Sequence, residues 1–135
     1  MEDNYIMSGN VRRSTKGSAG YDIIMPNDIV IKPDEERLIP TDLIINLRSG
    51  CFGLVTARSS LYSRTGCIIV NTPAIIDSDY NNDDVKIHIK NLSKEEVLLK
   101  AGERIAQIVI VPFELFQNEI PPINERKGGI GSTGK

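Results

Sequence analysis

Short apolar runs, most of them rich in β-branched residues, dominate the hydrophobic pattern of this chain. Residues 85–90 alternate strictly: Val85, Ile87 and Ile89 are apolar and the residues between them are polar, which is typical of a strand with one buried face. Similar runs bounded by proline, glycine or polar residues occupy residues 21–25, 28–32, 42–47, 51–57, 67–71, 96–100 and 104–113. No helical periodicity extends beyond about ten residues, and a turn or two within residues 59–65 is the one helix candidate. The pattern therefore predicts an all-β sandwich or barrel.

The C-terminal end differs from the rest of the chain. From Gln117 onward the sequence is polar and interrupted by prolines, and it ends in GGIGSTGK. Such a composition cannot build a core. We therefore expect residues 1–116 to form one domain and residues 117–135 a separate tail. In isolation this composition more often marks a disordered terminus, and the alternative is a segment that orders over a ligand.

Length and charge narrow the possible functions. The 135 residues suffice for one domain with its own core, and a net charge of −2 provides no global basic field, so we expect no direct nucleic-acid binding. No apolar stretch approaches the roughly 18 residues of a membrane helix, and no signal peptide is visible, so we expect an intracellular protein, cytoplasmic or nuclear, without membrane binding. His88, Cys51 and Cys67 lack the spacing of zinc ligands, and we expect buried thiols rather than a disulfide.

Residues 57–61, ARSSL, are a candidate phosphate site. Arg58 offers a planar fork of donors, and the hydroxyls of Ser59 and Ser60 can donate to anionic oxygens. A helix that begins here would add unpaired amide groups. On these residues alone, a serine N-cap beside a surface arginine is the simpler interpretation.

Residues 71–80, NTPAIIDSDY, are a candidate site for a nucleobase and for a general base. Asn71 offers a donor and an acceptor to a base edge, and Tyr80 offers an aromatic plane. Ile75 and Ile76 precede Asp77, and partial desolvation by them would make its carboxylate a stronger base than one in open water. A strand that runs into an aspartate-rich turn explains the same segment equally well on its own.

Three further segments share one order along the chain with these two. The segments AGYD (19–22), RSSL (58–61), NTPAIIDSDY (71–80), GERIAQ (102–107) and GGIGSTG (128–134) resemble, in turn, the five motifs of the trimeric dUTPase family. Each segment alone is a weak signal. Five of them in register across residues 19–134 are specific.

The resemblance implies a fold, an assembly and a reaction. The family fold is a jelly-roll-like, distorted β-barrel. The barrels form homotrimers with active sites shared between subunits, and the C-terminal arm, here residues 117–135, closes over a site. The implied activity is hydrolysis of dUTP to dUMP and pyrophosphate with Mg²⁺, which limits uracil incorporation into DNA and supplies dUMP for thymidylate synthesis. The triphosphate itself would hold most of the metal, because its oxygens are the ligands that Mg²⁺ prefers.

The same resemblance implies a role for each matching residue. Asp77 would deprotonate the attacking water, Tyr80 would exclude a ribose 2′-hydroxyl, and Asp22 would approach the metal through water. Asn71 would read uracil together with the backbone at Ile75 and Ile76. The residues expected at the phosphates are Arg58, Ser59, Ser60, Gln107, Arg126, Ser132 and Thr133, with Ile130 and Gly131 beside them in the closing arm.

Three positions depart from the family pattern. Ile130 stands where the family usually has an aromatic residue that stacks on uracil, a contact worth about 0.5–1.5 kcal/mol, so we expect weaker arm closure and a higher KM. Arg126 lies one position nearer to Ile130 than the family arginine lies to its aromatic, and we expect it still to reach a phosphate. The hairpin after Tyr80 is one residue longer. We place the extra residue in the turn, since the alternation after it is intact, which leaves Lys86 as a candidate nucleotide contact.

Three other functions are compatible with parts of this sequence. A dCTP deaminase shares the fold and an RSSL-like segment, but it needs an additional carboxylate on the strand after the hairpin, where this chain has VKIHIKN. A nucleotide-sensing regulatory module with little or no catalysis would fit the three departures. A structural barrel without nucleotide fits the composition but leaves the five ordered motifs unexplained.

Overall fold

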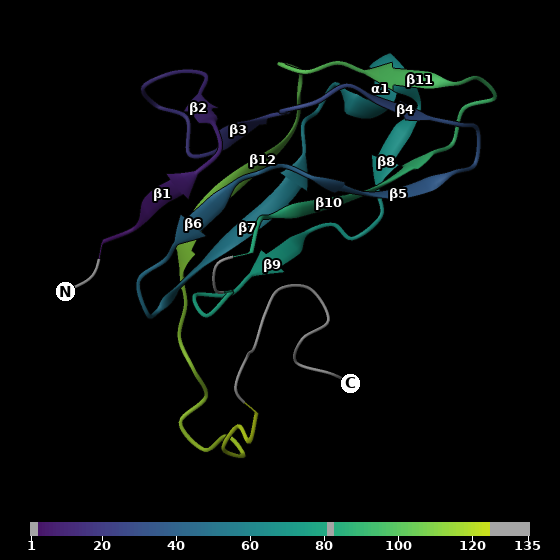
Figure 1. The fold of residues 1–135 in the computed structure, drawn as a ribbon. Helices are drawn as coiled ribbons and strands as arrows, with labels where there is room; N and C mark the ends of the chain where they lie inside the picture. Colours follow the sequence, from purple (N-terminus) through teal and green to yellow (C-terminus); the bar gives the residue numbers. More distant parts are fainter. Residues whose placement is uncertain (1–2, 81–82, 125–135) are drawn as a thin grey trace.

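The computed structural model describes residues 3–80 and 83–124, and within them the chain forms twelve strands and one short helix (Figure 1). The strands are β1 (Tyr5–Ser8), β2 (Val11–Arg13), β3 (Tyr21–Ile24), β4 (Ile29–Ile31), β5 (Glu36–Pro40), β6 (Ile44–Asn46), β7 (Cys51–Ala57), β8 (Cys67–Ile69), β9 (Ala74–Ile76), β10 (Lys86–Asn91), β11 (Val97–Leu99) and β12 (Arg104–Pro112). The helix is α1 (Leu61–Thr65). The predicted all-β fold is confirmed. In the described part of the chain, no helix has the length and apolarity needed to cross a membrane.

The strands form two larger sheets and two strand pairs. One sheet has the order β2-β3-β12-β7-β9 and the other has the order β5-β10-β8, while β1 pairs with β6 and β11 pairs with β4. Neighbouring strands are antiparallel throughout. The sheets do not join into one continuous ring of strands. The architecture is therefore the distorted, jelly-roll-like barrel that the sequence predicted.

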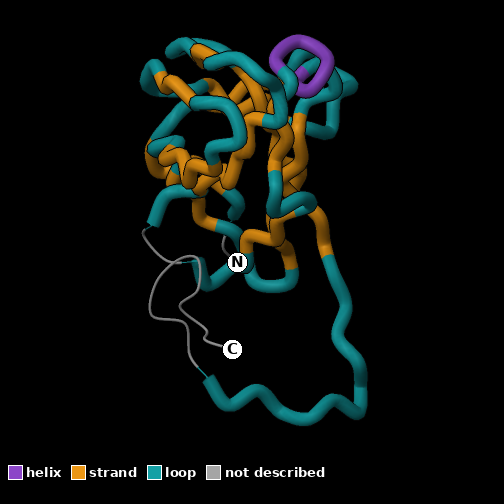
Figure 2. The backbone as a smooth tube through the Cα atoms, turned by 90° about the vertical axis from the view of Figure 1, so that its right-hand side faces the viewer, coloured by secondary structure: helices purple, strands orange, loops and turns teal. Residues whose placement is uncertain are grey.

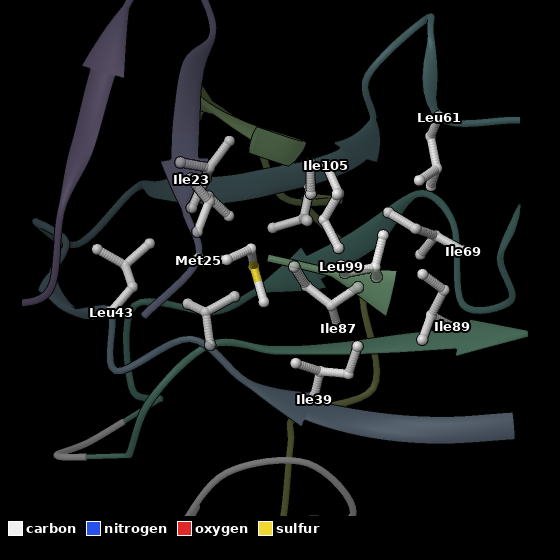
Figure 3. Close-up of a cluster of buried hydrophobic side chains, with 14 of the residues drawn as sticks. Ile23, Met25, Ile39, Leu43, Leu61, Ile69, Ile87, Ile89, Leu99 and Ile105 are labelled. Atoms are coloured by element: carbon white, nitrogen blue, oxygen red, sulfur yellow. The ribbon is translucent and has the colours of Figure 1, made fainter. Parts of the chain in front are cut away.

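Both larger sheets contribute to one isoleucine-rich core. In β10, Ile87 and Ile89 are buried while the residues between them are partly exposed, as the alternation predicted. Figure 3 shows these two side chains in one cluster with Ile23 and Ile105 of the five-stranded sheet. The largest fully buried side chains are Ile23, Met25, Ile31, Ile39, Leu43, Leu61, Ile87, Ile89, Leu99, Ile105, Val55 and Val85. Each contributes about 1.5–3 kcal/mol on burial, and together they fix β3, β12 and β7 side by side.

Asn91 is the polar exception inside this core. Its side chain is fully buried, and its amide nitrogen donates to the carbonyl oxygens of Ile31 at 2.9 Å and Glu95 at 2.8 Å. Its Oδ1 accepts hydrogen bonds from the backbone nitrogen and the hydroxyl of Ser93. All its polar atoms are therefore paired, and they tie the end of β10 to β4 and to the loop before β11. Cys51 and Cys67 are buried free thiols, as predicted.

Strands β1, β2 and β5 have no counterpart among the predicted runs, and β9 corresponds only to the strand given above as the alternative for residues 71–80. All four residues of β1 are exposed, β2 has only three residues, and Ile39 is the one buried residue of β5. A strand with so little buried surface shows no clear alternation in its sequence. These strands form because neighbours offer hydrogen-bonding partners: β6 to β1, β3 to β2 and β10 to β5.

After β12 the chain leaves the body of the barrel (Figure 2). Residues 113–124 contain no helix or strand, and all of them are exposed. Phe116 is 84% exposed, and Ile120 and Ile123 are each 92% exposed, which is unusual for large apolar side chains in a soluble chain. The predicted tail begins within this segment, and its last residues, 125–135, lie outside the described residues.

Candidate active site

A polar pocket of about 310 Å³ lies where β3, β12 and the end of β7 meet. Its lining residues are Ser14, Ser18, Ala19, Gly20, Asp22, Arg58, Ser59 and Gln107. Strand register explains the gathering: Gln107 of β12 pairs with Asp22 of β3 on one side and with Thr56 of β7 on the other, and Arg58 follows the end of β7. Three of the five predicted segments therefore meet here, although they are far apart in the sequence.

Asp22 is the electrostatic centre of this pocket. Its side chain is 5% exposed, and its Oδ1 lies 3.2 Å from Nε of Arg58. Its Oδ2 lies 3.6 Å from Nη1 of Arg104 and accepts a hydrogen bond from Ser14 Oγ at 2.9 Å. A buried carboxylate is tolerated only when it is paired, and these partners satisfy that condition. In return Asp22 fixes the guanidinium of Arg58 at the wall of the pocket.

Gly20 allows Gln107 to reach into the pocket. A Cβ at Gly20 would collide with Oε1 of Gln107 and would lie 3.2 Å from its Cδ. The absence of a side chain at Gly20 therefore leaves room for the Gln107 amide beside Asp22. This close approach explains the glycine before Tyr21 and Asp22, which the sequence alone left as a weak signal.

The serines after Arg58 are not engaged in capping the helix. Ser60 occupies the N-cap of α1, but its side chain makes no capping hydrogen bond, and Ser59 and Ser60 are both exposed. The N-cap interpretation therefore does not account for the Ser60 hydroxyl. The helix has only five residues, so its macrodipole is small. We therefore expect side chains to make the main contacts with any anion at this position.

The second group of predicted residues lies on β9 and the hairpin that follows it. Ile76 is buried, whereas Ile75 is 55% exposed and Asp77 is exposed. The expectation that both isoleucines desolvate Asp77 is wrong for the single chain, because successive strand residues face opposite sides and only Ile76 faces the core.

Tyr80 and Lys86 are held by the hairpin itself. Tyr80 is 6% exposed, and its hydroxyl donates to the carbonyl oxygen of Asp84 at 3.0 Å. Nζ of Lys86 lies 2.8 Å from Oδ1 of Asp83 and 2.6 Å from Oδ1 of Asp84. Burial of the ammonium would lower the pKa of Lys86, but its hydrogen bonds to Asp83 and Asp84 outweigh this effect and raise the pKa. The ammonium therefore has two protein partners already, and its contact with nucleotide stays a prediction.

Asn71 lies at the same end of the barrel. The backbone nitrogen of Val70 donates to the carbonyl oxygen of His88, which places the exposed Asn71 beside the start of β10. Tyr80 and Lys86 meet at Asp84, whereas the role of Asn71 in base binding stays a prediction.

One chain does not bring the two groups together. Ile76 pairs with Gly53 near the beginning of β7, so Asp77 lies near Phe52, whereas Arg58 follows the other end of the same strand. The six residue-to-residue steps from Phe52 to Arg58 span about 20 Å at roughly 3.3 Å per step. Figure 1 shows the same separation, with β9 at one end of the barrel and α1 at the other.

Sequence reasoning overlooked several residues that the structure places at these sites. Ser14, Ser18 and Arg104 join the pocket or its ion pairs, and Asp83 and Asp84 hold Lys86. The serines belong to a Ser- and Gly-containing loop before Gly20, and Arg104 lies within GERIAQ, so both signals were present in the sequence. Five predicted residues lie outside the described residues: Arg126, Ile130, Gly131, Ser132 and Thr133.

The chain is similar to known proteins over nearly its whole length. Residues 9–134 match the family model described as dUTPase. A deoxyuridine 5′-triphosphate nucleotidohydrolase of Hydrogenobaculum sp. is 38% identical over 90% of this chain and 87% of its own length. The protein of the same name from Lactococcus lactis subsp. lactis is 39% identical over 91% of this chain and 86% of its own length. The crystal structure of dUTPase from Streptococcus mutans superposes with a TM-score of 0.78 at 26% identity and covers 87% of this chain and all of its own.

Proposed function

This chain belongs to the dUTPase family and hydrolyses dUTP to dUMP and pyrophosphate, and on that premise we propose which of its residues carry the reaction. The observation that supports the assignment is the pocket at β3, β12 and β7. It gathers the guanidinium and a serine hydroxyl of RSSL and the amide of GERIAQ around one neutralised carboxylate, which belongs to AGYD. We propose that this pocket binds the triphosphate.

The phosphate ligands in this proposal are Arg58, Ser59, Ser60 and Gln107. Arg58 is 30% exposed, and its guanidinium touches Asp22 through Nε, which leaves other donors of the fork for phosphate oxygens. Gln107 donates through its amide nitrogen. Phosphoryl transfer needs positioning and charge neutralisation more than covalent help, and these groups provide both.

Asp22 and its partners fit a magnesium-nucleotide complex in one particular way. The family uses Mg²⁺, and when bound the ion neutralises and polarises the phosphate oxygens. Two guanidiniums already neutralise Asp22, so its carboxylate suits a contact through water better than direct ligation. We infer that the triphosphate holds most of the ion and that Asp22 orients a water on it.

Asp77 is the proposed general base. Its carboxylate takes a proton from a water whose oxygen attacks the α-phosphorus, while the bond from that phosphorus to the bridging oxygen breaks and pyrophosphate leaves. Nothing in this step requires a covalent intermediate with the protein. Asn71 and the backbone at Ile75 and Ile76 bind uracil in this proposal, and Tyr80 lies against the deoxyribose, where a 2′-hydroxyl would collide with it.

We propose a homotrimer with shared sites, supported by the separation within one chain. Arg58 and Asp77 lie at opposite ends of β7, about 20 Å apart by strand length, and one nucleotide cannot contact both with its α-phosphate. A neighbouring subunit that supplies Asp77 and Tyr80 beside the pocket of the first completes the site. The exposed Phe116, Ile120 and Ile123 support an arm that packs on a neighbour.

The arm completes the proposal. Residues 1–116 form the barrel domain and residues 117–135 the arm, which closes over the site. In the arm we assign Arg126, Ser132 and Thr133 to the phosphates, and Ile130 and Gly131 to the cover over uracil. The support is the order of the motifs, since these five residues lie outside the described residues.

The decisive experiment is pyrophosphate release from dUTP with Mg²⁺, beside dCTP, dTTP and UTP, for wild type and Asp77→Asn. We expect turnover of dUTP alone and a loss of about a thousandfold or more in the variant, because a water without its base reacts slowly. Equal turnover by the variant would refute the role of Asp77. Binding of dUTP without pyrophosphate release by wild type would instead favour the regulatory alternative, and ammonia release from dCTP would favour a deaminase.

A further inference from the structure

Lys86 is connected to Tyr80 through Asp84. Its Nζ contacts the carboxylates of Asp83 and Asp84, and it lies 3.5 Å from the carbonyl oxygen of Asp84. That carbonyl oxygen also accepts the hydrogen bond from the Tyr80 hydroxyl at 3.0 Å. One peptide group therefore connects the lysine to the tyrosine.

The chain around Thr41 holds the same aspartate from the other side. The second carboxylate oxygen of Asp84, Oδ2, accepts hydrogen bonds from the backbone nitrogens of Thr41 at 2.9 Å and Asp42 at 3.1 Å. The buried Thr41 hydroxyl donates to the carbonyl oxygen of Val85. The backbone nitrogen of Val85 donates to the carbonyl oxygen of Leu43 at 2.8 Å. Asp84 is thus fixed to the segment between β5 and β6 through Oδ2, and Lys86 contacts its other carboxylate oxygen, Oδ1.

We propose that Lys86 is a positioning residue that sets the sugar selectivity of this enzyme. With Asp83 and Asp84 it fixes the carbonyl group that holds the Tyr80 hydroxyl, and Tyr80 in turn excludes a ribose. The inference rests on the sugar-excluding role proposed above for Tyr80.

The need for such a support follows from charge and from geometry. The hairpin carries four aspartates, Asp77, Asp79, Asp83 and Asp84, within eight residues. The last two are adjacent and both contact Lys86, so without an ammonium between them they repel each other and the turn opens. Exclusion of a 2′-hydroxyl requires a ring that cannot yield by about half an ångström, and such precision depends on the groups behind it.

The test compares Lys86→Met with Lys90→Met as a matched control. Both remove a lysine from the same face of β10, and Lys90 pairs with Asp34 at 3.5 Å, four residues further along the strand. The measurement is the ratio of kcat/KM for dUTP to kcat/KM for UTP, together with the ratio of the Kd values of UMP and dUMP. We expect Lys86→Met to lower both ratios about tenfold, mainly because UMP binds more tightly and the KM for dUTP rises. Lys86→Arg keeps the positive charge and should therefore retain most of the wild-type value of both ratios. Lys90→Met should change the ratios less than about twofold.

A second comparison establishes that the effect passes through Tyr80. In a Tyr80→Phe background the hydroxyl bond to Asp84 is absent, so adding Lys86→Met should change the ratios little further. An equal additional drop in that background would overturn the proposal, as would ratios in Lys86→Met that match Lys90→Met. Should Lys86→Met not fold, Asp83→Asn removes one ion-pair partner and should lower the ratios in the same direction. A wild type without dUTP turnover would refute the function itself, whereas the Kd ratios test the positioning role separately.

Discussion

At the scale of single residues, the site depends on which side chains are absent as much as on which are present. Gly20 has no Cβ, so Gln107 can lie against it, and the Asp22 side chain is only 5% exposed, so its charge is balanced by two arginines. Arg58 is held by Asp22 before any ligand arrives, which reduces the rotamer entropy lost on binding a phosphate. The pocket is therefore arranged in advance by its own ion pairs.

The first residue-scale prediction concerns Gly20→Ala. The new methyl group displaces the Gln107 amide, and loss of a hydrogen bond to a charged phosphate lowers kcat/KM for dUTP by about 10–100-fold. Steady-state kinetics measure this effect. The matched control is Gly17→Ala in the same loop, where a Cβ meets nothing within 4 Å and activity should be unchanged. Equal activity of the two variants would contradict the assignment of Gln107.

At the scale of elements, the hairpin between β9 and β10 is a charged structure rather than a tight apolar turn. Its aspartates and Lys86 replace the packing that a hydrophobic hairpin would use, and Thr41 ties it to the end of β5. Burial alone would raise the pKa of Asp84, but hydrogen bonds from Lys86 and from the amides of Asp42 and Thr41 outweigh it and lower that pKa. The ionised carboxylate of Asp84 therefore stabilises the hairpin more than its protonated form does.

The element-scale prediction is a pH dependence of that stabilisation. Because folding lowers the pKa of Asp84, its ionised form stabilises the folded state above the unfolded value of about 3.9, and the contribution is lost as pH falls below it. The raised pKa of Lys86 keeps its own contribution present up to about pH 10. Asp84→Asn should therefore lower the free energy of unfolding by about 1 kcal/mol at pH 7 and by little at pH 3. Urea unfolding at one fixed protein concentration measures both values, and an equal difference at the two pH values would exclude this mechanism.

At the scale of the whole molecule, β7 separates the two halves of the chemistry. The strand carries Arg58 after one end and pairs near its other end with the residue before Asp77, so the barrel cannot close a site around one nucleotide alone. The exposed apolar side chains of residues 113–124 point to the same requirement for a neighbour. Assembly is thus part of catalysis in the proposed mechanism, rather than a means of stabilising each subunit.

The whole-molecule prediction is complementation between two inactive variants. Arg58→Ala and Asp77→Asn should each have little activity alone. In trimers reassembled from an equal mixture, about one quarter of the sites receive an intact Arg58 from one chain and an intact Asp77 from the other. Recovered dUTP turnover near a quarter of wild type would support shared sites. No recovery after denaturation and joint refolding, with trimers verified by light scattering, would place both residues in one chain's own site.

Much of this arrangement was predictable from local patterns. The alternation of residues 85–90, the run 51–57 and the run 104–113 correspond closely to β10, β7 and β12, because long strands with one buried face show their periodicity in the sequence. Gly20, Asp22, Arg58 and Gln107 were candidates by residue type and order. Strands β1, β2 and β5 were not found, because their pairing partners rather than their own burial define them.

What the sequence determined by itself is therefore the class of the fold, the membership of a family and the identity of most polar groups that we propose for nucleotide binding. Those properties depend on residue type and on short-range order along the chain. The tertiary structure decided which of these groups meet: Arg104 and Ser14 lie at Asp22, Lys86 contacts Asp83 and Asp84, and β9 pairs with the end of β7 that is opposite to Arg58. Register between strands distant in sequence controls such meetings, and a one-residue shift in that register would reverse which side chains face the site.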